Sequence, residues 1–190
     1  MAQPAATLSP VRSAPGLHPP GLPRAAGWMS GARFAALVLM FLALHALLEW
    51  PALDAPLFGL NAATADVAIA WLSLVSVSLV REGTMVLHAQ GFVTEVHQVC
   101  TLLLPAALLT AGIAMHPHGR VGDKLAGMLL GVALVAVVNQ CRLVGVIWVG
   151  VMAPDLFGAV HGWLAPAWLV ALTTAYGWVW SRTVCPKVSP

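Results

Sequence analysis

The sequence predicts an all-α protein: a polytopic helical bundle in a membrane, with about four to five apolar helices and a short hairpin-like segment outside the lipid. Of its 190 residues, 59% are hydrophobic and 8% are charged, whereas about a quarter of the residues in soluble domains are charged. Several apolar runs approach the ~20 residues that a helix needs to cross a hydrocarbon core of about 30 Å. Lipid offers the backbone no hydrogen-bond partners, so a span is either a helix or part of a closed barrel. Runs this long and continuous favour helices.

Charge and cysteine content argue against several kinds of protein. The net charge is +2 and the sequence has no basic patch, so nothing in it indicates a nucleic-acid partner. The three cysteines, Cys100, Cys141 and Cys185, form no CxxC pair, which argues against a disulfide framework or a zinc ribbon. A single thiol can still be reactive.

The N-terminal part contains a tail and a first span. Residues 1–32 are rich in proline, alanine and glycine and show no apolar period, which predicts a disordered cytoplasmic tail. The tail is too long for the n-region of a cleaved signal peptide. The apolar run from Arg33 to Trp50 therefore predicts an uncleaved span. We expect a loop after it, with the residues Pro51, Asp54, Pro56 and Asn61.

The middle of the chain is less regular. Residues 65–80 are apolar, but the run is short and dotted with serines. Residues 84–99 contain two β-favouring runs around Gln90-Gly91, which predicts a hairpin outside the lipid. We expect the next helix from Cys100 to Met115, followed by the polar turn at 116–124.

The C-terminal part begins with a long apolar run, from Leu125 to about Met152. A break is expected at 153–160, and the last helix from His161 to Ser181. The predicted membrane domain covers residues 33–182, and residues 183–190 form a cytoplasmic tail.

Lysine and arginine bias predicts the orientation, because short loops rich in these residues stay in the cytoplasm. The N-terminal tail, the 116–124 turn and the C-terminus carry most of these residues, so we expect all three to be cytoplasmic. With both termini inside, the number of crossings is even, whereas five helical candidates are present. We assign the weakest candidate, 65–80, to the outer interface or to a re-entrant segment. The alternative is that it spans and that one terminus lies outside.

Three polar residues reach a similar depth. Cys100 lies about 16 residues before the 116–124 turn and Arg142 about 18 residues after it, so both stand roughly 24 to 27 Å from the cytoplasmic end at 1.5 Å per residue. His161 opens the expected last helix, again at the outer end. Helix rotation is not fixed by this arithmetic, so it does not decide whether the three side chains face one another.

Each of these residues also has a purely structural interpretation. An arginine at membrane depth costs roughly 2.5 to 3.5 kcal/mol on insertion scales and usually serves a function, but Arg142 could snorkel to the headgroups. Asn139, one helical turn before it, could link helices. Cys100 could be a small buried hydrophobe. His161 alone would more often cap or pack than catalyse.

Other histidines and cysteines are weaker candidates. His97 lies three residues before Cys100 and is an alternative base, but an extended segment would place the two side chains on opposite faces. His116 and His118 are interpreted as part of a solvated cytoplasmic turn and not as metal ligands. We interpret Cys141 as a packing residue and Cys185 as part of the tail.

The order of these motifs resembles the exosortase/archaeosortase family of membrane transpeptidases, in a compact form similar to exosortase H. The resemblance covers about residues 80 to 180 and rests on "VHQVCTLL", then "NQCR", then "AVHGWL". Family members have a cysteine after an extracytoplasmic segment, an Asn-x-x-Arg pattern and a histidine at the start of the final helix. This chain has Cys100-Thr101-Leu102 where the family commonly has Cys-Ser-Gly, which leaves the subfamily open.

The resemblance implies a cysteine protease and transpeptidase of the bacterial inner membrane, with its active site facing the periplasm and no cofactor or metal. Cys100 would be the nucleophile, Arg142 would stabilise the oxyanion, His161 would be the general acid and base, and Asn139 would orient Arg142 or His161. The implied partners are exported proteins whose C-terminal sorting signal consists of a motif, a transmembrane helix and a basic cluster, together with membrane lipid. The competing class is a non-catalytic transporter or assembly subunit, in which Arg142 and Asn139 bind an anion or brace helices.

Overall fold

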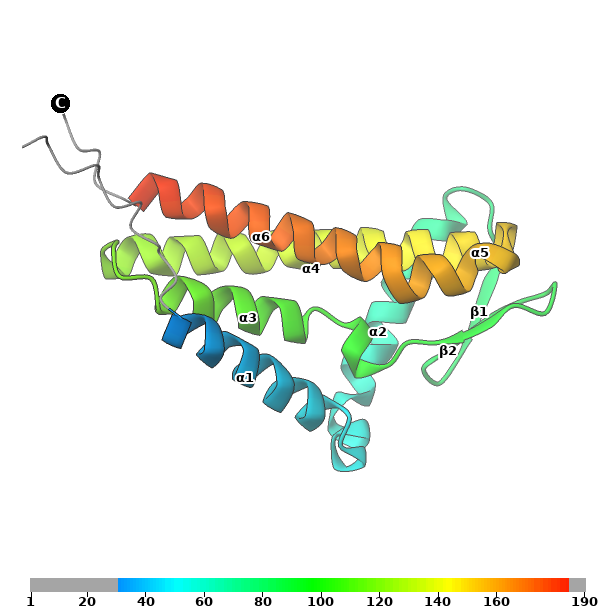
Figure 1. The fold of residues 1–190 in the computed structure, drawn as a ribbon. Coiled ribbons are helices and arrows are strands. Elements are labelled where there is room, and N and C mark those ends of the chain that lie inside the picture. Colours follow the sequence, from blue (N-terminus) through cyan, green and yellow to red (C-terminus); the bar gives the residue numbers. More distant parts are fainter. Residues whose placement is uncertain (1–30, 185–190) are drawn as a thin grey trace, which may run out of the picture.

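The computed structural model describes residues 31–184. Residues 1–30 and 185–190, which belong to the two predicted tails and include Cys185, lie outside the described residues. The described chain is a helical bundle with one small sheet at its end (Figure 1). Four helices run alongside one another: α1 (Gly31–Leu48), α3 (Leu103–Ala114), α4 (Val121–Met152) and α6 (Ala165–Val184).

Length and composition confirm the predicted class. Within residues 31–184, four helical segments are long and apolar enough to cross a membrane, and they are Gly31–Leu48, Pro51–Ser73, Val121–Met152 and Pro154–Val184. Helix α3 has only 12 residues. The start of α1, the α3–α4 turn and the end of α6 lie at one end of the bundle (Figure 1). Arg33, the 116–124 turn and Arg182 therefore lie at the same end of the described bundle.

Helix α2 (Asp54–Ser73) runs steeply across the other helices near their far end (Figure 1). The interfacial assignment of residues 65–80 stays a prediction, because the segment Pro51–Ser73 is itself long and apolar enough to span. The loop expected before them is wrong, since residues 51–53 form a 3-10 turn and α2 begins at Asp54. Pro51 and Pro56 lie at the starts of helical segments, where no hydrogen bond from the proline nitrogen is required, and Asp54 suits the positive end of the helix dipole.

An antiparallel sheet lies at the same end of the bundle as α5 (Figure 1). Its strands are β1 (Leu79–Glu82), β2 (Met85–His88) and β3 (Val93–Glu95), in that order. The predicted hairpin around Gln90-Gly91 is confirmed as β2–β3, and the sequence analysis missed β1. Gly83 and Gly91 have φ of +65° and +91° at the two turns, a conformation that glycine adopts at little cost.

The segment after α4 differs from the expected break. Only Ala153 leaves the helical conformation, with φ −146° and ψ 68°. Helix α5 (Pro154–Ala159), a π-turn (Val160–Leu164) and α6 then continue as one helical segment. His161 therefore lies inside a helix, in its π-turn, and does not open it.

Two groups of buried residues form the core. The thiol-end cluster comprises Ala65, Ala68, Leu72, Val77, Val86, Val96, Cys100, Leu143 and Ile147. The basic-end cluster comprises Ala106, Leu109, Ile113, Val135 and Trp180. Close helix contact in the second cluster depends on Gly127 and Gly131 of α4, where an added Cβ would lie 2.2 Å from Trp180 Nε1 and 2.6 Å from Leu109 Cδ2. Small residues at such spacing let membrane helices approach closely.

Candidate functional site

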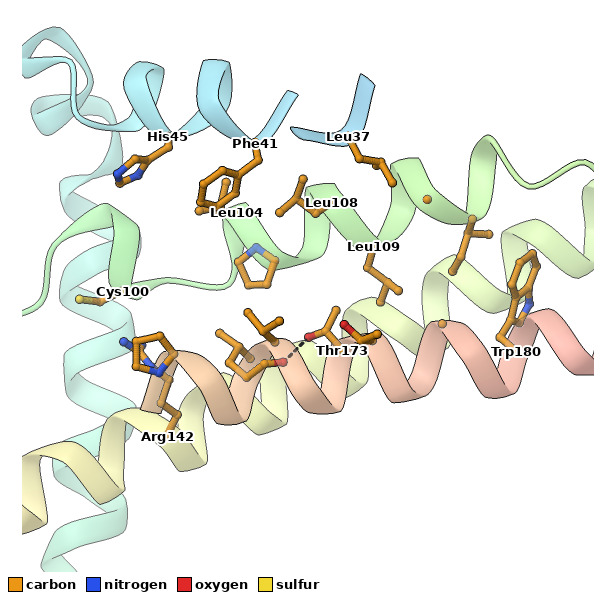
Figure 2. A pocket seen from close by; sticks show the side chains of 18 of the residues that line it. Leu37, Phe41, His45, Cys100, Leu104, Leu108, Leu109, Arg142, Thr173 and Trp180 are labelled. Atoms are coloured by element: carbon orange, nitrogen blue, oxygen red, sulfur yellow. Dashed lines mark hydrogen bonds between the residues drawn. The ribbon is translucent and has the colours of Figure 1, made fainter. Parts of the chain in front are cut away.

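A cavity of about 600 Å³ lies between α1, α3 and α6. Cys100, Arg142 and His161 all line it. Figure 2 shows Cys100 and Arg142 at the same end of this cavity, with His45 on the facing wall and Trp180 at the opposite end. The Arg142 guanidinium is also close enough to the His161 ring to act on it electrostatically. The three residues that sequence arithmetic placed at one depth thus meet in one cavity.

Cys100 lies in a 3-10 turn, Gln98–Cys100, and not at the start of the α-helix as expected. The turn is fixed by short hydrogen bonds: Cys100 N donates to the His97 carbonyl (2.8 Å), and Thr101 Oγ1 donates to the Gln98 carbonyl (2.6 Å). Cys100 is 8% exposed and Thr101 2%. A buried, hydrogen-bonded turn holds the thiol in a defined place at the cavity wall.

Gln98 anchors this turn to the rest of the protein. Its side chain is 1% exposed, accepts a hydrogen bond from Asn61 Nδ2 (3.1 Å), and donates to the Leu48 carbonyl and to Asp54 Oδ1 (both 2.8 Å). It therefore ties the turn to the end of α1 and to α2. The sequence analysis missed Gln98, because a single glutamine near an apolar run does not reveal partners 37 to 50 residues away.

Asn139 contacts the same turn. Its Nδ2 donates to the Cys100 carbonyl at 2.9 Å, and the side chain is 2% exposed. We expected it to orient Arg142 or His161, but the structure pairs it with the backbone of the cysteine. Its Oδ1 is buried without a hydrogen-bond partner in the described part of the chain.

Arg142 lies on α4 at the thiol end of the cavity (Figure 2). Its side chain is half-buried and lines the cavity beside Cys100. Within residues 31–184 its Nε has no hydrogen-bond partner. A buried guanidinium nitrogen without a partner is costly.

The His161 ring is held by aromatic packing. It stacks on Phe157 with the centroids 5.3 Å apart and the planes 4° apart, and Phe157 meets Phe92 edge to face at 5.3 Å. Gly150 makes room for this pair, because a Cβ there would lie 2.2 Å from the Phe92 ring. The loop between β2 and β3 thus supports a residue of the last helical segment. π-turns of this kind often occur at functional sites.

His45 is a second residue that the sequence analysis missed. It lies on α1, lines the cavity, and stacks on Phe41 with centroids 5.9 Å apart and planes 16° apart. Figure 2 shows its ring on the wall opposite Arg142. The cavity therefore presents imidazoles from two helices at its thiol end.

The alternative candidates lie elsewhere or behave differently. His97 does not line the cavity, and its Nε2 lies 4.0 Å from Asp54 Oδ1. His116 is not solvated as expected: it is 3% exposed, packs edge-on against Trp180 at 5.3 Å and lines the far end of the cavity. Cys141 is exposed on α4 instead of packed. Among residues 31–184, no three His, Cys, Asp or Glu side chains are grouped to hold a metal.

Comparison with known proteins identifies the family of the chain. The model of the transmembrane exosortase family matches residues 7–180, most of the chain. No curated protein and no solved structure matches. Membership suggests a membrane enzyme of protein sorting. With four span-length helical segments within residues 31–184, the chain is a multi-pass membrane protein and belongs to the transmembrane exosortase family.

Proposed function

We propose that this protein is a cysteine transpeptidase that cleaves C-terminal sorting tails of exported proteins and transfers the new C-terminus to an acceptor. The observation that carries the proposal is the meeting of Cys100, Arg142 and His161 in one cavity. A thiol, a permanent cation and an imidazole are the groups that acyl transfer requires: a nucleophile, an oxyanion stabiliser and a proton carrier.

The roles follow from the chemistry of each group. The sulfur of Cys100 attacks the scissile carbonyl carbon while His161 takes the thiol proton. The oxyanion that forms is stabilised by Arg142, whose charge needs no proton of its own. The C–N bond breaks, His161 gives the proton to the leaving amine, and a thioester remains on Cys100. An acceptor amine or hydroxyl then attacks the thioester, passes its proton through His161 and restores the thiol.

The position of the basic residues supports a periplasmic active site in the bacterial inner membrane. Arg33, Lys124 and Arg182 lie at the end of the bundle where α1 starts and α6 ends. Basic segments stay in the cytoplasm. Cys100 lies at the other end of the cavity (Figure 2), on the side from which an exported protein would approach.

The decisive variant is Cys100→Ala. Tailed precursors should accumulate uncut in cells that carry it, while the protein remains folded in the membrane. Cys141→Ala is the matched control, since this exposed thiol lies outside the cavity. Normal processing by Cys100→Ala would refute the thiol mechanism and favour the non-catalytic class. The mass of the product's new C-terminus distinguishes transfer from hydrolysis.

A further inference from the structure

We propose that the bilayer around this protein is thinned beside α1 and α3, so that water reaches the thiol end of the cavity from the side. The inference goes beyond the proposed function, because it concerns the lipid around the cavity and not the reaction inside it. The partner is a phospholipid bilayer whose core is locally thinner than the roughly 30 Å of an undisturbed membrane. Helix lengths, the depth of Cys100 and the open side of the cavity support it.

The helices on the two sides of the bundle differ in length. Helix α1 packs against α3, and α4 packs against α6. Figure 1 shows α4 extending well beyond α1 and α3 at the end where α5 lies. The helical segments that contain α4 and α6 have 32 and 31 residues, whereas α1 has 18 and α3 has 12. At 1.5 Å per residue, α1 and α3 are roughly 27 and 18 Å long, and both are shorter than a hydrocarbon core of about 30 Å.

Charged residues shorten the apolar part of α1 further. Arg33 and Glu49 flank its apolar run, and the 16 positions between them correspond to roughly 24 Å of helix. On the last helical segment, His161 and Arg182 are 21 positions apart, or roughly 31 Å. A helix whose apolar run is shorter than the core is accommodated by thinning of the bilayer. The side formed by α1 and α3 therefore favours a thinner bilayer than the side formed by α4 and α6.

The depth of Cys100 follows from its contact with α4. Its carbonyl accepts a hydrogen bond from Asn139 Nδ2 (2.9 Å), so the turn of Cys100 is level with Asn139. Lys124 marks the basic end of the bundle, because its Nζ donates to the Ala114 and His116 carbonyls (2.9 and 2.7 Å). The 15 positions from Lys124 to Asn139 give roughly 22 Å of helix. In an undisturbed core that begins at Lys124, the turn would lie about 8 Å inside the far boundary.

The cavity is open to the surroundings within the depth of the membrane. Phe41 of α1 and Val170 of α6 line it and are 38% and 64% exposed. In an undisturbed bilayer, acyl chains would therefore approach the polar groups at the thiol end, among them Arg142 and His161. Charged and polar groups at such a depth are costly, and local thinning with entry of water lowers the cost. A thinned bilayer thus brings water to the groups that line this end of the cavity.

Cys141 is a control thiol at nearly the same depth. It directly precedes Arg142 on α4, but it is exposed and does not line the cavity. Val137 and Leu134, about one and two helical turns before it, are 60% and 37% exposed. Apolar residues at this spacing form one face of a helix, and an exposed apolar face suits contact with lipid. This face belongs to the long side of the bundle, so a bilayer of ordinary thickness should cover Cys141.

Thiol labelling in bilayers of three thicknesses tests the inference without requiring catalysis. In the full chain, Cys141→Ala/Cys185→Ala keeps only Cys100, and Cys100→Ala/Cys185→Ala keeps only Cys141. Each variant is reconstituted in dimyristoleoyl, dioleoyl or dierucoyl phosphatidylcholine, in order of increasing thickness. A membrane-impermeant, sulfonated methanethiosulfonate is supplied on both sides of the vesicles. Each labelling rate is divided by the rate of the same variant in decyl maltoside micelles, which corrects for burial within the protein.

We expect Cys100 to be labelled about tenfold faster than Cys141 in dioleoyl lipid, the ratio that several Å of mismatch give. Cys100 should also be labelled about tenfold more slowly in dierucoyl than in dimyristoleoyl lipid, because thinning a thicker bilayer costs more. Equal rates for the two thiols in dioleoyl lipid, or a Cys100 rate that does not depend on the lipid, would overturn the proposal. Labelling does not depend on cleavage, so this result is separate from the processing test of Cys100→Ala.

A second measurement lengthens the apolar run of α1. Glu49 is exposed just past the end of this helix, and Glu49→Leu moves the polar boundary beyond it. In the variant that keeps only Cys100, labelling in dioleoyl lipid should become about threefold slower, since one more residue adds about 1.5 Å of apolar length. Glu82→Leu removes the same charge from an exposed residue of β1 and should leave the rate unchanged. An unchanged rate in Glu49→Leu, or an equal decrease in Glu82→Leu, would contradict thinning beside α1.

Discussion

The two ends of the bundle are stabilised in different ways. At the basic end, helices interlock through glycines: Tyr176 Oη donates to the Gly127 carbonyl at 2.6 Å, and Lys124 Nζ donates to the Ala114 and His116 carbonyls at the end of α3. At the thiol end, a network of hydrogen bonds around Gln98 holds a short turn, and Asn61 Oδ1, Asn139 Oδ1 and Arg142 Nε remain buried without partners in the described chain.

This difference suggests that the basic end of the bundle serves stability and the thiol end serves the reaction. Close packing at the basic end holds helices together, and changes there should act on folding. Unpaired polar groups at the thiol end lower stability, and native proteins tolerate such groups mainly where they serve a function. Changes there should act on activity more than on folding.

Arg142→Ala should have the largest effect, on activity. Removing one donor to an oxyanion in other enzymes costs about 2.7 to 4 kcal/mol, or about 10² to 10³ in kcat. Since Arg142 Nε has no partner within residues 31–184, its loss should not lower the melting temperature. Precursor processing rates and thermal unfolding in detergent measure the two quantities. If the variant has a lower melting temperature but an unchanged processing rate per folded molecule, Arg142 stabilises the fold and does not take part in the reaction.

Gly131→Leu should have the opposite signature. Its side chain would collide with Leu109 and Tyr176, and overpacking of this kind costs about 1 to 3 kcal/mol. The melting temperature should fall while the rate per folded molecule stays near that of the wild type. Gly122→Leu, in open space on the same helix, is the control. A loss of rate without a loss of stability would mean that the two ends are coupled.

Gln98→Leu should affect both quantities. It leaves Asn61 Nδ2 and the Leu48 carbonyl, both buried, without their partner and frees the turn that carries Cys100. A buried polar group left unpaired costs about 1 to 3 kcal/mol. Because Gln98 positions the turn of Cys100, its substitution should lower kcat and leave KM for a tailed precursor unchanged. If stability falls and kcat does not, the network supports the fold alone.

Tyr176→Phe should have the smallest effect. It removes one hydrogen bond, to the Gly127 carbonyl, and such bonds between membrane helices contribute about 0.6 kcal/mol on average. The melting temperature should fall by a few degrees at most, and processing should be unchanged. A larger drop would show that Tyr176 contributes by more than its hydroxyl.

The sequence predicted the fold class and the common depth of three polar residues, because helix rise per residue is constant. It did not predict which faces meet, since rotation depends on packing between distant helices. The expected loop at Pro51–Asn61 is helical because prolines at helix starts are compatible with helices. Gln98 and His45 were not predicted, because the sequence around a single polar residue does not show which residues of other helices it contacts. The solvated interpretation of His116 was wrong because Trp180, 64 residues later, covers it.

The π-turn at Val160–Leu164 has a consequence for how this region tolerates change in length. A π-turn accommodates one residue more than an α-helical turn, so it shifts the angular phase of α5 relative to α6 by about 100°. Deleting Gly162 would restore an uninterrupted α-helical repeat and rotate Phe157 out of line with the walls of α6. Substitutions keep the number of residues in the π-turn constant. Insertions and deletions change it, and therefore test the rotation of α5 relative to α6.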